Sequence, residues 1–105
     1  MNNYNFGLKP EYLKIIIDTI SKNKKIKKAI IYGSRAKGNF KDGSDIDIAI
    51  IAPELEFSEY LKIIDEMEQL DIPNKIDITN YDLLDNAIIE HIKRWGKEIY
   101  VSLEK

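Results

Sequence analysis

Apolar residues along this chain first recur at the spacing of helices. From Pro10 to about Asn23 they fall on one helical face, and Pro10 suits an early position of that helix. A second amphipathic stripe runs from Phe57 to Leu70. A third runs from Leu84 to Trp95, where Gly96 is expected to end it. The pattern therefore predicts three main helices.

Between these helices, shorter apolar or alternating runs predict strands. The predicted strands cover residues 28–32, 44–52, 75–79 and 97–101. Ser34 is suited to cap a short helix that starts at Arg35 and stops at Gly38. The resulting order, αβαβαβαβ, predicts an α/β or α+β domain in which helices pack against a small mixed sheet.

Composition limits the classes of function. A chain of 105 residues is expected to form one compact domain, residues 1–105. Its net charge of −2 makes direct nucleic-acid or membrane binding unexpected. The sequence contains no cysteine, which fits a reducing cytoplasm and excludes disulfides and thiolate metal sites. No signal peptide is visible, and the apolar runs are far shorter than the roughly 20 residues that cross a bilayer.

Two carboxylates lie one residue apart where the second predicted strand begins. Asp45 and Asp47 would point to the same face of that strand. Two like charges held together repel each other and lose water, and a divalent cation resolves that conflict. Because Mg²⁺ takes oxygen ligands from one or two carboxylates and from substrate phosphates, the pair indicates a magnesium site.

A Gly-Ser pair precedes these carboxylates by ten intervening residues. Gly33 lets a phosphate approach the backbone without a Cβ in the way, and Ser34 adds a hydroxyl and an amide at a helix start. In the same loop, Arg35, Lys37 and Lys41 could neutralise a polyphosphate. A lone Gly-Ser is usually only a turn, but its position between two strands and before Asp-x-Asp favours a functional interpretation.

A third carboxylate is expected because two-metal sites activate an attacking oxygen and stabilise a leaving pyrophosphate in one displacement. Asp77 is the candidate, since it lies in the middle of a predicted strand whose isoleucines face the other way. Asp71 and Asp82 are nearby alternatives.

The stretch Gly-Ser, ten residues, Asp-x-Asp resembles the signature of the DNA polymerase beta-like nucleotidyltransferase superfamily. The start Gly-Ser-Arg-Ala-Lys-Gly resembles its minimal nucleotidyltransferase (MNT) branch, and the resemblance extends to the ending Arg94–Tyr100. It implies the polymerase beta-like fold, with Gly33 and Ser34 binding the nucleotide triphosphate. It also implies that Asp45 and Asp47 bind two Mg²⁺ ions, with Asp77 as the third carboxylate.

The MNT resemblance also implies a partner. Such proteins resemble antitoxins that modify a tyrosine of a HEPN-type RNase toxin with AMP from ATP. Because so short a chain has little room for an acceptor-binding domain, we expect acceptor choice to depend on a partner in a homo- or hetero-oligomer. Two alternatives stay open: a catalytically silent, nucleotide-binding antitoxin that acts by contact alone, and nucleotidyl transfer to a small molecule.

The remaining polar and aromatic features have simpler interpretations. Five lysines between Lys22 and Lys28 are expected to be a solvated helix end rather than a partner-docking patch. His91, the only histidine, is expected at a surface or half-buried position and not in catalysis. Trp95 and Tyr100 are expected to be core residues rather than an exposed partner patch.

Overall fold

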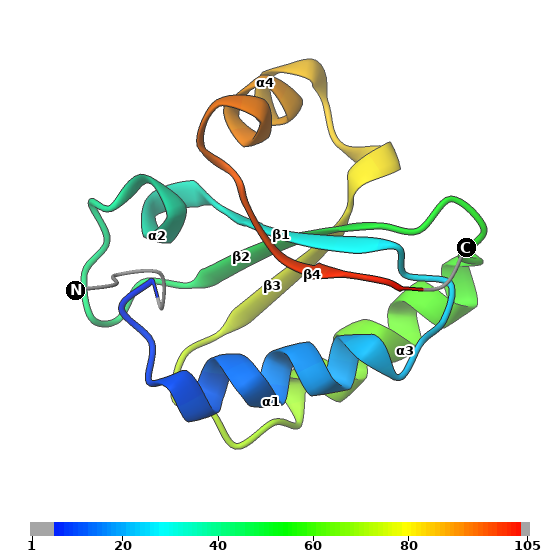
Figure 1. The fold of residues 1–105 in the computed structure, drawn as a ribbon, viewed down its shortest axis with the longest axis horizontal. Coiled ribbons are helices and arrows are strands. Elements are labelled where there is room, and N and C mark those ends of the chain that lie inside the picture. The colour runs from blue at the N-terminus through cyan, green and yellow to red at the C-terminus, as the bar shows by residue number, and fades with distance from the viewer. Residues whose placement is uncertain (1–5, 104–105) are drawn as a thin grey trace.

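A computed structural model describes residues 6–103, which build a four-stranded sheet with helices on both faces (Figure 1). The helices are α1 (Pro10–Ser21), α2 (Gly33–Lys37), α3 (Phe57–Glu68) and α4 (Asn86–Trp95), with a 3₁₀ turn, η1 (Tyr81–Leu83). The strands are β1 (Lys28–Tyr32), β2 (Ile46–Ile51), β3 (Ile76–Asn80) and β4 (Lys97–Val101). The predicted α/β class and mixed sheet are confirmed.

The sheet has the order β3-β2-β1-β4. β1 pairs antiparallel with both β2 and β4, whereas β2 and β3 run parallel. The parallel pair needs a long crossover connection, and α3 supplies it. This order places β2, the strand of the candidate carboxylates, inside the sheet with a neighbour on each side.

The two faces of the sheet carry cores of different size. α1 and α3 cover one face, and α4 covers the other (Figure 1). The α1/α3 face holds the larger core, whose fully buried large side chains are Ile16, Ile20, Ile26, Ile31, Ile46, Ile48 and Ile50. Under α4 lies a smaller cluster of Ile30, Ala49 and Ile92. Since side chains alternate along a strand, Asp47 and Ala49 share the face that α4 only partly covers.

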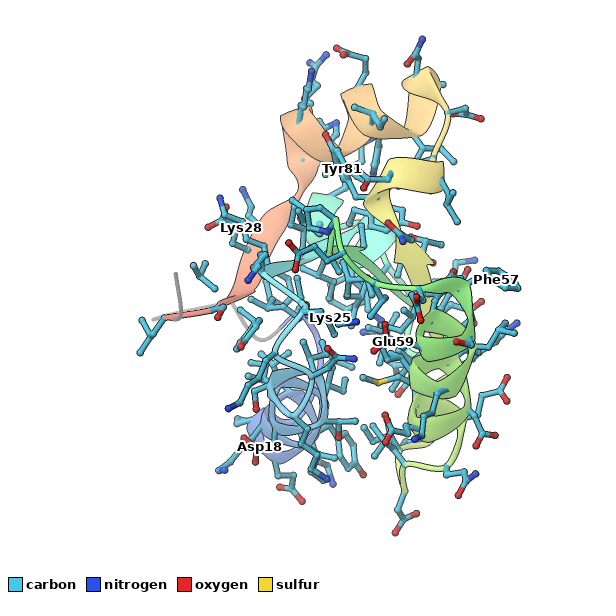
Figure 2. All side chains as sticks on the ribbon, turned by 90° about the vertical axis from the view of Figure 1, so that its right-hand side faces the viewer. Asp18, Lys25, Lys28, Phe57, Glu59 and Tyr81 are labelled. Atoms are coloured by element: carbon cyan, nitrogen blue, oxygen red, sulfur yellow. The ribbon has the colours of Figure 1, made fainter. Side chains whose placement is uncertain are left out.

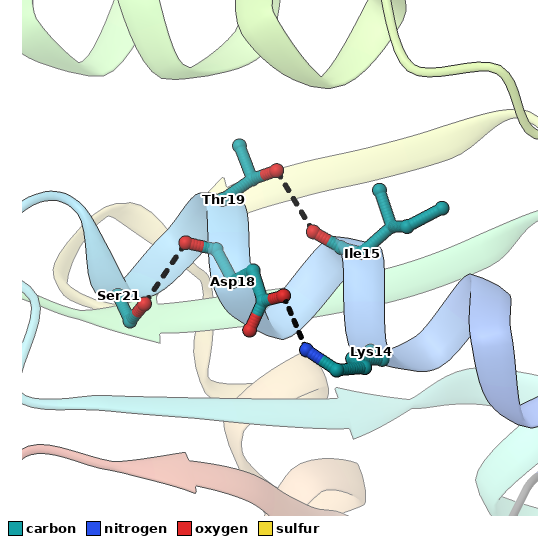
Figure 3. A network of polar contacts seen from close by, with 5 residues as sticks. All are labelled: Lys14, Ile15, Asp18, Thr19 and Ser21. Atoms are coloured by element: carbon teal, nitrogen blue, oxygen red, sulfur yellow. Dashed lines mark hydrogen bonds and ion pairs between the residues drawn. The ribbon is translucent and has the colours of Figure 1, made fainter.

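Local contacts stabilise the first turns of α1 and α4 and the exposed side of α1. Pro10 occupies the first turn of α1, as predicted, and Asp85 caps α4 by accepting a hydrogen bond from the Ile88 amide at 3.0 Å. Within α1, Lys14 pairs with Asp18 at 2.8 Å, one helical turn away (Figure 3). No helix among residues 6–103 is long and apolar enough to cross a membrane.

The lysine-rich turn between α1 and β1 is tied to its neighbours by ion pairs. Lys25 Nζ lies 2.8 Å from Glu59 on α3 (Figure 2). Lys28, the first residue of β1, has its Nζ 3.0 Å from Glu98 on β4. The Lys25–Glu59 pair raises the pKa of Lys25 and lowers that of Glu59, chiefly through the hydrogen bond between the two side chains. At least two of the clustered lysines therefore join the turn to the rest of the fold.

Candidate active site

The Gly-Ser pair lies where β1 ends and α2 begins. Gly33 has φ +73°, in the left-handed region that glycine adopts without strain. A Cβ at this position would overlap the Asp47 carboxylate oxygen Oδ2, because Tyr32, the residue before it, pairs directly with Asp47 across the two strands. Glycine is therefore required here both by the backbone angle and by the close approach of Asp47.

The helix that follows begins earlier than the sequence indicated. α2 starts at Gly33 rather than Arg35, so Ser34 lies within its first turn and the predicted capping role of Ser34 is wrong: no side chain caps this helix. The predicted stop is confirmed, since Gly38 has φ +97° and its amide donates to the Ser34 carbonyl at 2.8 Å. α2 is one short turn whose start is fixed by the glycine conformation.

Asp47 and Asp77 lie directly opposite each other on parallel neighbouring strands. Adjacent strands are about 4.8 Å apart, so their side chains emerge from the same face as near neighbours. The spatial proximity expected for this pair is confirmed. Asp77 is exposed and Asp47 is half-buried, which leaves the pair open to solvent on the Asp77 side.

Asp45 lies just before β2 rather than within it. The preceding turn keeps it out of the sheet: the Ser44 amide donates to the Lys41 carbonyl at 3.0 Å, and Ser44 Oγ accepts from the Lys41 amide at 2.9 Å. The sheet pairing resumes at Ile46, whose amide donates to the Lys75 carbonyl at 2.8 Å. Asp45 is thus an exposed carboxylate at the entrance to the strand that carries Asp47.

The three carboxylates influence each other electrostatically. Partial burial raises the pKa of Asp47, and the charges of Asp77 and Asp45 raise it further, while His91 acts in the opposite direction. This is the repulsion that the sequence predicted for closely placed carboxylates. A bound cation would relieve it, and carboxylate oxygens are the ligands that Mg²⁺ prefers.

The donor chemistry fits magnesium, but the described part of the chain holds no preassembled site. Among residues 6–103, no three His, Cys, Asp or Glu side chains are gathered closely enough to hold an ion. Asp47 and Asp77 are paired by strand register, and Asp45 is separated from them by its position before the strand. The third ligand would come from a rearranged Asp45 side chain or from a substrate oxygen.

Two side chains that the sequence did not single out line the same face. The Tyr32 hydroxyl lies 3.2 Å from Thr79 Oγ1, two residues beyond Asp77 on β3. Burial raises the pKa of Tyr32, and the nearby charges of Asp47 and Asp77 add to that effect. This contact spans β2 and fixes the tyrosine ring beside the carboxylates.

His91 reaches the Gly-Ser turn from α4. Its Nε2 accepts a hydrogen bond from the Gly33 amide at 3.0 Å, and its ring meets Tyr32 edge to face at a centroid distance of 6.2 Å. The predicted half-buried position is confirmed, but its contact with the turn was missed. A contact between residues 58 apart leaves no spacing pattern in the sequence.

Arg35 is buried among carbonyl groups. Only 3% of the residue is exposed, and its guanidinium donates to the carbonyls of Phe6 at 2.9 Å, Ser44 at 2.9 Å and Asp42 at 3.2 Å. Burial lowers its pKa. These contacts hold the loop before Asp45, so the structure does not bring Arg35 to the carboxylates as a free phosphate-binding group.

Lys37 lies at the far end of α2 from Gly33. Its Nζ is 5.4 Å from the centre of the Trp95 ring, which also contacts the Arg94 guanidinium at 5.5 Å. Lys37 and Lys41 are both exposed. Trp95 and Tyr100 are each partly buried, and Tyr100 packs against the main core.

Comparison with known proteins gives the chain a family context. Residues 14–105 match the family model described as "Polymerase beta, Nucleotidyltransferase". A protein of Methanocaldococcus jannaschii, named "Putative protein adenylyltransferase MJ0604", is 32% identical over 81 residues, which are 77% of this chain and 70% of that protein.

Solved structures with the same fold include antitoxin complexes. One is a toxin–antitoxin structure with AMP-PNP, which matches 87% of this chain and 74% of its own with a TM-score of 0.71 and 19% identity. Another is a tri-AMPylated HEPN toxin of Shewanella oneidensis in complex with an MNT antitoxin, covering 86% of this chain and 70% of its own, with a TM-score of 0.64 and 18% identity. At these identities the likeness is one of fold.

Proposed function

Because the chain belongs to the polymerase beta nucleotidyltransferase family, we propose that it is a magnesium-dependent adenylyltransferase that moves AMP from ATP to an acceptor hydroxyl. The observation that carries the proposal is the register of Asp47 with Asp77, together with the contact of Asp47 with the Gly33 turn. The triphosphate would lie against the turn and the carboxylates on their exposed Asp77 side. Likeness to a structure that holds AMP-PNP supports ATP as the donor.

Asp45, Asp47 and Asp77 would hold the metal, with two ions as the expected number. Bound Mg²⁺ would neutralise the negative charge of the triphosphate and of the leaving pyrophosphate. The protein's own contribution is to hold Asp47 and Asp77 on one open face before the metal arrives. The raised pKa of Asp47 reflects that arrangement.

The other residues would orient the reactants. Gly33 allows the Asp47 carboxylate to approach the turn, and the Ser34 hydroxyl is available to donate to a phosphate oxygen. The acceptor oxygen attacks the α-phosphorus, the bond to the pyrophosphate oxygen breaks, and pyrophosphate leaves with the bonding electrons. Asp77, which is exposed to solvent, would orient the acceptor hydroxyl and take its proton. Positioning and charge neutralisation supply the catalysis.

The acceptor we propose is a tyrosine of a HEPN-type toxin, so that the reaction silences the toxin. Support comes from the likeness to an MNT antitoxin that was solved with a tri-AMPylated HEPN toxin. The exposed Asp77 leaves room for a side chain presented by another protein. Such an antitoxin would act in the cytoplasm, beside its partner.

The test is transfer of label from α-labelled ATP to the protein encoded beside this chain, with Mg²⁺ present. Wild type should label the partner, and Asp47→Ala should reduce labelling at least about 100-fold, since metal ligation supplies several kcal/mol. Asp71→Asn is the matched control and should label normally, since Asp71 is exposed and lies beside Glu11 and Tyr12 of α1 rather than with Asp47.

One observation favours a second candidate, an antitoxin that binds nucleotide but acts by contact alone: the carboxylates are not gathered into a ready three-ligand site within residues 6–103. The same assay separates the two. Tight partner binding and toxin inhibition with no label, from wild type and Asp47→Ala alike, would reject the enzyme.

A further inference from the structure

α4 contacts both ends of α2, the short helix that carries the Gly-Ser pair. His91 and Trp95 are four residues apart on α4, and they meet Gly33 and Lys37, which are four residues apart on α2. Residues at this spacing lie on the same side of a helix. One face of α4 therefore contacts the first and the last residue of α2, and His91 makes the hydrogen bond at the end nearest the carboxylates.

We propose that His91 is a positioning residue for the nucleotide-binding turn. Its Nε2 accepts a hydrogen bond from the Gly33 amide and so fixes the orientation of the peptide group that joins Tyr32 to Gly33. This inference rests on the proposed function, because the turn is taken to hold the triphosphate. The contact itself belongs to the free protein and can be measured without nucleotide.

Gly33 needs such an anchor because a glycine has no side chain that can hold its own backbone. Glycine populates positive and negative φ about equally, so the left-handed conformation at +73° is accessible but not enforced by sterics. Asp47 approaches the Gly33 Cα from one side without a hydrogen bond to its amide. The His91 contact is the directional interaction that selects one orientation of this amide.

The imidazole is itself held in place. Tyr32 meets the His91 ring edge to face, and the tyrosine hydroxyl is held by Thr79. In this contact Nε2 is the acceptor of the hydrogen bond and the Gly33 N–H is its donor. The positioning role of His91 requires a hydrogen-bond acceptor at the Nε2 position, which glutamine can supply and phenylalanine cannot.

Nuclear magnetic resonance tests the contact in the free protein. Wild type should show a coupling across the hydrogen bond between the ¹⁵N nuclei of the Gly33 amide and His91 Nε2. Amide exchange at Gly33 should be slower in wild type than in His91→Phe. Absence of the coupling in folded wild type, or equal Gly33 exchange in the two proteins, would overturn the proposal whatever the enzyme does.

Kinetics test the positioning role. In His91→Phe the KM for ATP in the transfer assay should rise about fivefold to tenfold, roughly the contribution of one hydrogen bond, with kcat little changed. His91→Gln should return the KM to within about twofold of wild type. Glu90→Gln, on an exposed neighbouring position of α4, is the matched control and should leave the KM unchanged.

These outcomes distinguish a failure of the proposed transfer reaction from a failure of the proposed role of His91. A wild type that shows the coupling but transfers no AMP contradicts the proposed function and leaves the contact in place. A His91→Phe variant with wild-type KM, or a His91→Gln variant as impaired as His91→Phe, contradicts the positioning role while transfer by wild type stands. If His91→Phe does not fold, the wild-type coupling and the His91→Gln kinetics still decide.

Discussion

Asp47 is held where its charge is unfavourable for the folded protein. Partial burial and the charges of Asp77 and Asp45 all raise its pKa. The strand register that places it opposite Asp77 is fixed by the buried isoleucines on the other face of β2 and β3, since a slip of one residue would expose them. The main core thus holds the carboxylates together against their repulsion.

Replacing this charge should stabilise the metal-free protein. Below the pKa of an unfolded Asp, the residue is neutral in both states and contributes nothing. As pH rises from there through the raised folded pKa, the folded state holds its proton longer, so the free energy of unfolding falls. Asp47→Asn lacks this loss and should be more stable at pH 7, by less than about 1 kcal/mol because solvent screens the half-open site.

Chemical denaturation of both proteins in chelator, from pH 3 to pH 8, measures the effect. The stability difference should open as pH rises through the acidic range and stay constant above it. A variant that is less stable than wild type at pH 7 would show that Asp47 is not under electrostatic strain. Added Mg²⁺ should raise the melting temperature of wild type more than that of Asp47→Asn.

Alanine substitutions at Gly33 and Gly38 separate the cost of a left-handed backbone angle from the cost of a close contact. Gly33→Ala should cost about 1–2 kcal/mol for the left-handed angle, and more because the new Cβ would meet the Asp47 carboxylate. Gly38→Ala is the matched control, since φ is +97° there but nothing lies within 4 Å of an added Cβ. Thermal unfolding of both variants checks this. Equal losses of stability in the two variants would mean that the Asp47 side chain moves away from the new Cβ without a cost in free energy.

At the scale of elements, the loop between α2 and β2 is held by two side chains. Asn74 Nδ2 donates to the carbonyls of Asp42 at 3.0 Å and Ser44 at 3.3 Å, and the buried Arg35 makes the larger number of contacts. Arg35 joins three carbonyls, including that of Ser44, two residues before the strand that carries Asp47. The guanidinium fork makes several such bonds at once, which an ammonium cannot copy. The entrance to β2 therefore depends on Arg35 more than on the loop's own exposed residues.

Arg35→Lys should lower the free energy of unfolding by about 1–3 kcal/mol, because the buried Phe6 carbonyl loses its Arg35 donor. The Asp42 and Ser44 carbonyls would keep only their hydrogen bonds from Asn74 Nδ2. Hydrogen exchange should rise in residues 39–45 and stay unchanged in α3. Lys37→Arg, at the exposed end of the same helix, is the control and should change neither quantity. A fully stable Arg35→Lys with normal loop exchange would assign the loop's order to other contacts.

The order of elements could be predicted because each has a strong local signal. Helical stripes with Pro10 and Gly96 at their ends, and isoleucine alternation around Asp77, specify the elements without reference to neighbours. The spacing of neighbouring strands predicted that Asp77 could reach Asp47, whereas the register that places them directly opposite each other comes from the structure. The role of Arg35 could not be predicted, because a basic residue after Gly-Ser looks the same whether it meets phosphate or loop carbonyls.

At the scale of the whole molecule, one face of the sheet carries the main core and the other carries the proposed site. The larger core lies under α1 and α3, whereas the α4 face combines a small apolar cluster with Asp47, Asp77, Tyr32 and His91. Because α4 covers that face only partly, a partner can approach the exposed Asp77. This division is what allows so short a chain to hold a site open at its surface.

The most direct measurement follows the two ends of ATP separately. The chain, its partner and Mg²⁺ are incubated with ATP labelled at either the α- or the γ-phosphorus, and label is measured on the partner and in released pyrophosphate. We expect the α label on the partner and the γ label in pyrophosphate, in equal amounts, with both lost in Asp47→Ala. Transfer of the γ label to the partner, or toxin inhibition with neither label transferred, would contradict the assignment of this site to nucleotidyl transfer.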